Sequence, residues 1–280
     1  MKEIRISYRT LGIRRTIRRT VPTLWGELSE QQFLAAVGAL HGNLSEAEYL
    51  HIMTTIPRRH LRKLDSWSTY LLQKLVDGLR SKQSLTSRFF IDHVGTLQAP
   101  APALADMSLL QFMTVDEFWF QADAQEPDTA KLARFVGALY LKPGQGYFSD
   151  DEGVQELVDF GENACEAIKT KGILHLLNIK KHQAKRIATL KAIAVNWAMI
   201  RLWLAKVYPL LFQAPEQKEN AQPSTLNAQR QTPKSPNWVK IFDAFVGDDI
   251  AHIDAYKHLP CMDAFRIINN RIRQNLTRKK

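Results

Sequence analysis

Residues 27–33 read ELSEQQF, and residues 106–112 repeat the same pattern as DMSLLQF. Each copy has an acid, an apolar residue, Ser, two variable residues, Gln and Phe. A Ser followed three positions later by Gln forms a capping box, in which each side chain accepts a hydrogen bond from the backbone amide of the other residue. Both copies follow a stretch that contains proline, so the sequence predicts two equivalent transitions from extended chain into helix.

The residues before the first copy predict a β-hairpin. Ile4, Ile6 and Tyr8 alternate with polar residues over 2–8, and this period of two indicates a half-buried strand. Residues 14–21 are expected to return as a second strand. After the first copy we expect helices from Ser29, from Ser45 and over 57–80, because apolar residues recur there at spacings of three and four.

The second half of the chain is predicted to be almost entirely helical. One or two short strands are expected within 88–98, followed by a connector that contains two prolines. Helices are then expected from Ser108, from residue 128 or 129, and from Asp150, where acids in the first turns suit the helix dipole. Residues 180–212 form the longest and most apolar predicted helix.

A change in composition defines the predicted domain organisation. Residues 213–237 are rich in Gln, Pro, Ser, Asn and Lys and contain no aromatic residue, so they bury too little apolar surface to offset their ordering entropy. We therefore predict a mainly α protein. Its globular body over 1–212 carries the N-terminal hairpin and one further short β segment, and a flexible, disordered linker occupies 213–237. A C-terminal helical hairpin over 238–280 follows, with helices at 238–245 and 262–276.

The overall composition is that of an ordinary soluble protein, with 45% hydrophobic and 24% charged residues among 280. Cys165 and Cys261 lie far apart, which argues against a disulfide framework and indicates a reducing compartment. Arginines interrupt the N-terminal apolar residues, so no secretory signal is expected. Residues 187–212 are the only membrane candidate, but the cations within them favour a buried or partner-facing helix.

The formal net charge is +10, and the two signs are segregated along the chain. Residues 143–168 contain acids and no Lys or Arg, whereas residues 167–215 contain Lys and Arg and no acid. Two interpretations are open. The blocks either dock onto a charged partner or neutralise one another inside the same fold.

No catalytic motif is present in the sequence. There is no phosphate-binding loop, dinucleotide fingerprint, zinc-protease motif or serine-hydrolase elbow. His252 and His258 lie near Asp248 and Asp249 but lack a diagnostic ligand spacing, so we expect a solvated capping role there. Cys165 lies among acids, which disfavour a reactive thiolate. The sequence predicts no catalytic residue, no cofactor, no metal site and a protein that is not an enzyme.

Lys and Arg are concentrated in the hairpin, in residues 58–63 and at the C-terminal end. Cations at this density attract phosphates whatever the base sequence of a nucleic acid. The candidate phosphate contacts are Arg14, Arg15, Arg18, Arg19, Arg58, Arg59, Arg62 and Lys63. The alternative is that these residues are solvated strand edges and helix ends, where arginine also discourages strand-to-strand aggregation.

A second candidate surface is apolar. Aromatic residues recur along 197–212, directly before the predicted linker, and apolar residues share one face of the last helix. Such stripes are either core or the interface for a partner helix. The candidate partner-binding residues are Trp197, Trp203, Tyr208, Phe212, Phe265, Ile268 and Ile272.

The order of these motifs resembles a group of uncharacterised proteins encoded by phages, prophages and related mobile elements of Bacteroidetes-type bacteria. The resemblance is carried by 21–33, by 107–112, by Leu139-Tyr140-Leu141-Lys142-Pro143, by Asn196-Trp197 and by 208–212. It implies a role in virion morphogenesis, and the linker with its charged helical end is similar to the ends of tail-assembly chaperones. No functional residue is implied by it.

Two function classes follow. The first is a non-enzymatic phage assembly protein, a tail-assembly chaperone or minor tail component, whose partners are other phage structural or assembly proteins. The alternative is a nucleic-acid-binding accessory protein that uses the basic hairpin and the C-terminal tail. Either is expected in the cytoplasm of the bacterial host, with the virion as a further location, and neither needs a cofactor or a membrane.

Overall fold

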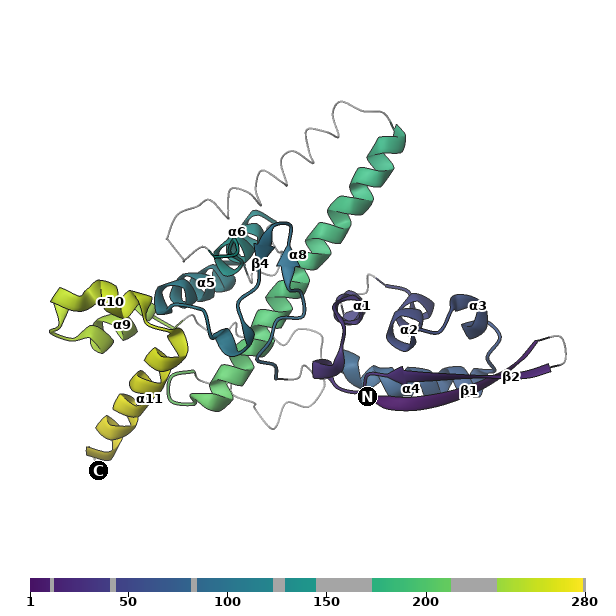
Figure 1. Ribbon diagram of the computed structural model, residues 1–280, viewed down its shortest axis with the longest axis horizontal. Coiled ribbons are helices and arrows are strands. Elements are labelled where there is room, and N and C mark those ends of the chain that lie inside the picture. Colours follow the sequence, from purple (N-terminus) through teal and green to yellow (C-terminus); the bar gives the residue numbers. More distant parts are fainter. Residues whose placement is uncertain are drawn as a thin grey trace, which may run out of the picture. The chain divides into compact units, whose positions relative to one another are not determined.

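The N-terminal hairpin pairs β1 (Lys2–Thr10) with β2 (Ile13–Val21) in an antiparallel register that sets Ile6 opposite Ile17. The structure is a computed structural model, and it describes residues 1–10, 13–40, 44–81, 85–122, 129–144, 173–212 and 236–278. The predicted acidic helix from Asp150, Cys165 and nearly all of the predicted linker lie outside the described residues. The prediction of a mainly α protein with a small N-terminal hairpin is confirmed (Figure 1).

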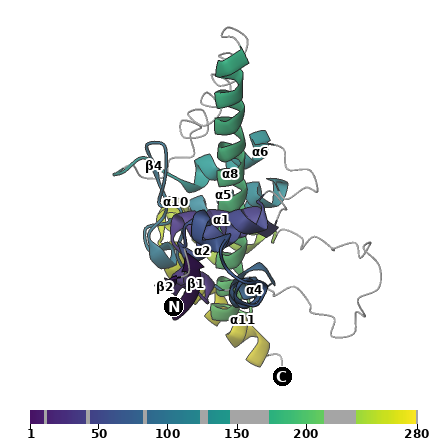
Figure 2. The same ribbon diagram turned by 90° about the vertical axis from the view of Figure 1, so that its right-hand side faces the viewer.

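Contacts divide the chain into two units, residues 1–92 with 173–199 and residues 93–172 with 200–280. The first unit holds the hairpin and four helices: α1 (Glu30–Leu40), α2 (Glu46–Thr54), α3 (Arg58–Leu61) and α4 (Ser66–Ser81). It also holds the larger part of α8 (Ile173–Val207), which Figures 1 and 2 draw as one continuous helix.

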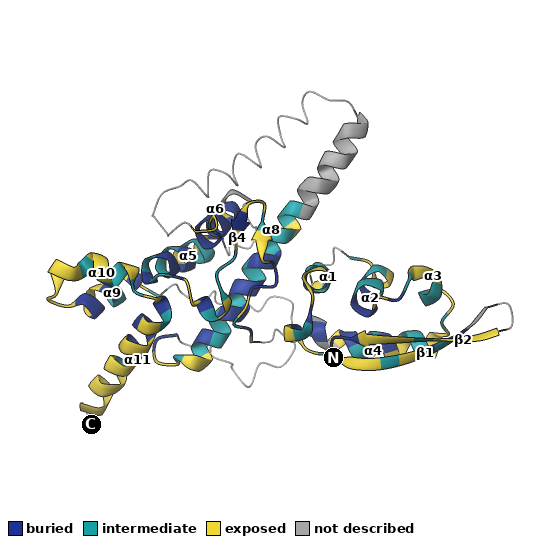
Figure 3. Ribbon diagram, viewed as in Figure 1, coloured by how far each residue is buried: buried dark blue, intermediate teal, exposed yellow. Residues whose placement is uncertain are grey.

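The second unit begins with a minimal hairpin, β3 (His93–Val94) and β4 (Leu97–Gln98), which is the predicted second β segment. Two helices follow, α5 (Leu109–Ala122) and α6 (Thr129–Leu139). The C-terminal part contributes α9 (Trp238–Val246), the short α10 (Ile253–His258) and α11 (Cys261–Arg278). In Figure 3 burial is concentrated on α5 and α6, whereas the far end of α11 is exposed.

The two sequence repeats are also structural repeats. A short 3₁₀ turn precedes each one, at Trp25–Glu27 and at Pro102–Leu104. In the first copy both bonds of the capping box form: Ser29 N donates to Gln32 Oε1 at 3.0 Å, and Gln32 N donates to Ser29 Oγ at 3.4 Å. In the second copy Gln111 N donates to Ser108 Oγ at 3.2 Å. The predicted helix starts are therefore confirmed.

Each Gln of the repeat also binds the end of the following helix. Gln32 Nε2 donates to the carbonyl of Met53 at 3.1 Å, and Gln111 Nε2 donates to the carbonyls of Ala138 and Leu139 at 3.2 and 3.3 Å. The last carbonyls of a helix have no partner within it, so an amide donor there satisfies groups that burial would otherwise leave unpaired. One sequence pattern thus builds the same two-helix hairpin twice, α1 with α2 and α5 with α6.

The Phe that ends each repeat is fully buried and lies in an aromatic cluster. Phe33 stacks on Phe90 at 4.5 Å between ring centroids, in the first unit. Phe112 contacts Phe265, Trp238 and Phe212 at 4.7, 5.3 and 5.8 Å in the second. Because the second cluster draws rings from α5, α9 and α11, the C-terminal helices pack into the second unit. The contacts therefore divide the chain differently from the predicted body over 1–212 and separate hairpin over 238–280.

Two helical boundaries differ from the prediction. The segment predicted as one helix over 57–80 is split, because Asp65 caps a new helix: its carboxylate accepts bonds from Ser68 N at 2.7 Å and Ser68 Oγ at 3.0 Å. The six-residue helix α10 was not predicted, because it is shorter than the windows over which helical periodicity can be recognised.

Candidate functional site

The hairpin is strongly basic on both faces. Residues 2–21 carry seven Lys or Arg residues and a single acid, Glu3. The strand register sets Arg5 opposite Arg18 on the outer face, and both are exposed. Like charges directly opposite each other destabilise a strand pair, and the exposed contact of Arg5 with Glu3 at 3.8 Å offsets little of that repulsion. The hairpin therefore carries a charge pattern that its own stability does not require.

The inner face of the hairpin packs against α3. Ile6 and Tyr8 are buried there, and the Tyr8 ring stacks on His60 with centroids 4.9 Å apart. Partial burial and, after it, the positive charges of Arg59, Lys63, Arg15 and Arg19 hold the pKa of the His60 imidazole below its ordinary value. Because Tyr8 pairs with Arg15 in the strand register, its stacking on His60 makes two basic clusters that are separated in sequence neighbours in the fold.

We use the name basic surface for a set of residues on both faces of the hairpin and at 59–63: Arg5, Arg14, Arg15, Arg18, Arg19, Arg59, Arg62 and Lys63. All are exposed. Seven were predicted as phosphate contacts, and the structure adds Arg5. The eighth predicted contact, Arg58, is instead engaged by Glu48 in an ion pair of 2.9 Å. This pair also lowers the pKa of Glu48, after the larger effect of its hydrogen bond with Ser45.

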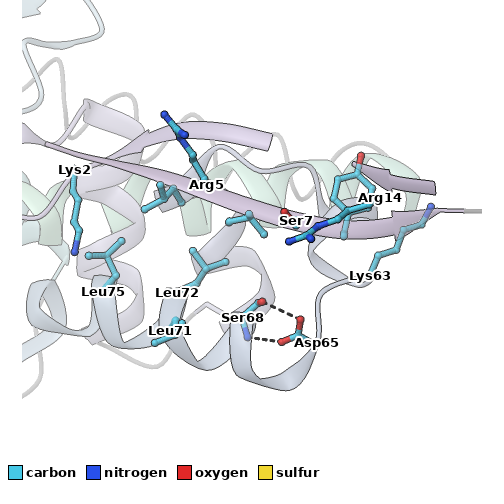
Figure 4. Close-up of a pocket in the computed structure, with 13 residues that line it drawn as sticks. Lys2, Arg5, Ser7, Arg14, Lys63, Asp65, Ser68, Leu71, Leu72 and Leu75 are labelled. Atoms are coloured by element: carbon cyan, nitrogen blue, oxygen red, sulfur yellow. Dashed lines mark hydrogen bonds between the residues drawn. The ribbon is translucent and has the colours of Figure 1, made fainter. Parts of the chain in front are cut away.

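An open groove of about 800 Å³ is lined by residues of both strands and of α4 (Figure 4). Its lining includes the cations Lys2, Arg14 and Lys63 and a single acid, Asp65; Arg5 also lines it, but its side chain points away from the leucines of α4 (Figure 4). The two bonds from Ser68 lower the pKa of Asp65 and commit its carboxylate to capping α4. Leu71, Leu72 and Leu75 form an apolar wall on α4. The groove therefore combines fixed positive charge with an apolar side.

An aromatic pair on α4 was missed by the sequence prediction. Trp67 and Tyr70 stack with ring centroids 5.7 Å apart, and 67% of Trp67 and 49% of Tyr70 are exposed. Leu71 is 48% exposed beside them. The signal in the sequence was the three-residue spacing of Trp67 and Tyr70, on the side of the helix away from the buried Leu72, Val76 and Leu79.

The apolar residues predicted to bind a partner are mostly buried, which favours the alternative that they are core. Trp197, Phe212, Phe265 and Ile268 are buried within the chain's own units, and Trp203, Tyr208 and Ile272 are half-buried. Trp197 lies 6.4 Å from Phe89, and Tyr208 OH donates to the carbonyl of Met262 at 3.2 Å. The same apolar stripe serves a core or an interface equally well, and here intrachain contacts occupy it.

The polar cluster near the C-terminus is a surface hydrogen-bond network. Asp249 contacts His252 Nδ1 at 2.6 Å and accepts a bond from Tyr256 OH at 3.0 Å, which together lower its pKa. Among the residues that the structure describes, no group of three or more His, Cys, Asp or Glu side chains is placed to hold a metal ion. Cys261 is buried, and this burial raises the pKa of its thiol to about 12, so it is not a nucleophile at neutral pH.

One described helical segment, Arg186–Val207 of α8, is long and apolar enough by length and composition to cross a membrane. Its polar residues are used inside the fold. Asn196 accepts a bond from Phe90 N at 2.8 Å and donates to the carbonyl of Arg88 at 3.1 Å, and Arg201 pairs with Asp116 at 3.2 Å. These contacts are those of a core helix.

Comparison of the chain with protein-family models, with curated proteins and with solved structures finds no match in any of the three. The resemblance to phage and prophage proteins therefore stays a prediction from the sequence motifs. The surface chemistry of the chain itself is the basis on which a function is proposed.

Proposed function

We propose that this chain is a non-enzymatic protein that binds nucleic acid through the basic surface. The observation that supports it best is the meeting of two basic clusters: Tyr8, which pairs with Arg15, stacks on His60, and Arg14 and Lys63 line the same groove. Cations gathered from separate segments, here on both faces of the hairpin and at 59–63, bind a polyanion by releasing its counterions.

The chemistry of the cations favours phosphate as the ligand. All but one of the residues of the basic surface are arginine. The planar guanidinium of arginine matches phosphate in a bidentate geometry, whereas the lysine ammonium acts as a point charge. A two-stranded ribbon can also follow a nucleic-acid groove or backbone. A surface that needs only solubility has no such requirement for arginine.

Protection of exposed strand edges does not account for the pattern. Both strands of a two-stranded sheet are edges, and charged side chains there prevent further pairing. That role is served by scattered charges, and it does not require Arg5 opposite Arg18 or a second cluster on α3. The phage-assembly hypothesis stays a prediction, because no comparison bears on it. Most of the residues assigned to its protein contacts are buried, so they do not form a free surface for a partner.

The first test measures binding of nucleic acid by the full chain over a salt series. The readout is the fluorescence anisotropy of a labelled oligonucleotide of about 16 nucleotides. For about five phosphate contacts, the affinity should fall roughly 100-fold between about 50 and 200 mM salt. Replacing Arg14, Arg15, Arg18 and Arg19 by Gln should weaken binding and reduce the salt slope by about 0.7 for each contact removed.

The matched control removes the same number of charges from the second unit, with Lys257, Arg266, Arg273 and Arg278 replaced by Gln. These residues are mostly exposed and lie on α10 and α11. The control should bind almost as tightly as the unmodified chain. Equal losses in the two variants would mean that net charge alone drives binding, and no binding at low salt would remove the proposal.

A further prediction concerns the protonation of His60. Bound phosphates would offset the charges of Arg15, Arg19, Arg59 and Lys63, which lower its pKa in the free protein, while Tyr8 covers the ring from β1. The pKa of His60 should therefore rise on binding. Because the bound state then holds more protons, affinity should be highest below the free-state pKa and decline as the pH rises through the bound-state pKa. An NMR titration of the His60 ring, assigned with His60→Gln, measures both values, and a pKa that does not move would exclude phosphate near this ring.

A further inference from the structure

We propose that the nucleic acid bound by this chain is single-stranded, and that its unpaired bases stack on Trp67 and Tyr70. This rests on the proposed function, and it names the class of nucleic acid that the site takes. The observation behind it is an exposed, stacked aromatic pair next to the cationic groove.

The aromatic pair has no role in the core of its own helix. The buried side of α4 is formed by Leu72, Val76 and Leu79, each at most 4% exposed. Trp67 and Tyr70 lie on the opposite side of α4, where a helix in water normally carries polar residues. Scattered apolar residues on a surface are common, but two stacked rings that adjoin an exposed leucine form a contiguous patch, and such patches mark binding sites.

The pair adjoins the charged groove through one shared residue. Leu71 is the next residue after Tyr70 and lies one helical turn after Trp67, and it also lines the groove with Arg5, Arg14 and Lys63. The exposed Lys74 follows one turn after Tyr70. A strand whose phosphates contact the cations of the groove would therefore have its bases within reach of the two rings.

Charge and aromatic character together select the occupant. In a duplex the faces of the bases are covered by their neighbours, so exposed rings gain little from it. In a single strand each base has a free face, and stacking on an aromatic side chain contributes about 1–3 kcal/mol per base with little dependence on sequence. An acidic protein would match the cations but would leave the rings without a specific partner. The combination of a cationic groove and a stacking pair fits a single strand best.

The test compares a single strand with a duplex of the same length and salt, using the full chain. The unmodified protein should bind the single strand more tightly. Replacing Trp67 and Tyr70 together by Ala should weaken single-strand binding by about 5- to 150-fold per stacked base. The same variant should keep its affinity for the duplex and its salt slope. Replacing both by Phe should restore most of the binding, because stacking needs the ring alone.

Replacement of Val239 and Ile250 by Ala is the control, since these apolar residues of the second unit are 66% and 71% exposed, and it should leave binding unchanged. Equal affinity for single strand and duplex, or no loss in the double Ala variant, overturns this inference while the proposed function stands. Binding of neither form overturns both. Binding of polyglutamate as tight as that of the oligonucleotide would point to an acidic protein partner instead.

Discussion

Replacing Asp116 by Ala is expected to lower the free energy of unfolding by about 3–5 kcal/mol. Asp116 is fully buried on α5, where its carboxylate accepts a bond from Trp238 Nε1 at 2.8 Å and lies 3.2 Å from Arg201 Nη1. The guanidinium of Arg201 is itself only 15% exposed and lies over the rings of Trp119 and Phe120. Loss of Asp116 leaves a buried cation without its counter-charge.

The electrostatics of Arg201 support this expectation. Burial lowers the pKa of Arg201, and the charge of Asp116 acts in the opposite direction. Because arginine does not release its proton in proteins, the unpaired charge must be hydrated by local opening of the structure. The bond from Trp238 is also the polar contact that joins α9 to α5, so the variant should lose protection of the C-terminal helices against proteolysis.

Urea denaturation measures this effect, with Glu117→Ala as the control. Glu117 is the exposed neighbour of Asp116 and accepts a bond from Gln121, so its loss should change stability by less than about 0.5 kcal/mol. The double variant Asp116→Ala with Arg201→Met should recover part of the lost stability, because both charges are then absent. A loss below about 1 kcal/mol for Asp116→Ala would contradict the assignment of a buried ion pair.

Replacing Phe112 by Ala is expected to cost about 3–5 kcal/mol through the cavity that it leaves. Phe112 is the fully buried ring around which Phe212, Trp238 and Phe265 gather, so one truncation removes contacts to α9, to α11 and to the segment that follows α8. Edge-to-face aromatic pairs contribute beyond the area that they bury. Phe112→Leu keeps most of the volume and should cost clearly less.

Thermal and urea denaturation of Phe112→Ala should be compared with Trp67→Ala. Trp67 is also aromatic but is largely exposed, so its loss should leave stability within about 0.5 kcal/mol. The pair of variants separates a core aromatic from a surface one. Similar losses at both positions would mean that Trp67 is packed against the protein, and would also weaken its assignment as a stacking residue.

Features that depend on neighbouring residues were predicted well from the sequence. The alternation over 2–8, the two Ser-Gln capping boxes and the Ser45 helix start all rest on bonds or contacts within a few residues. The predicted phosphate contacts were recognised as two separate clusters for the same reason. What could not be predicted was that β2 and α3 bring them around one histidine, because that proximity depends on packing between distant segments.

The contact of each repeated Gln with the end of the following helix could not be predicted from the sequence either. The bond between Gln32 and the Ser29 amide is local, but the bonds from Gln32 to Met53 and from Gln111 to Ala138 and Leu139 reach more than twenty residues along the chain. The stripes that hold Trp197, Phe212 and Phe265 could be either core or a partner surface by sequence, and in the structure these residues are buried. Periodicity identifies an apolar face, but it does not identify what covers that face.

The sequence by itself determined the helix starts, the hairpin, the excess of cations and the mainly α class, because hydrogen bonds and side-chain periodicity act over one or two turns. Only the tertiary structure decided which apolar faces are buried, which aromatic residues stay exposed on α4, and which cations share a surface. These depend on contacts between segments far apart in sequence, and the free energy of burying a side chain is set by whatever neighbour the fold supplies.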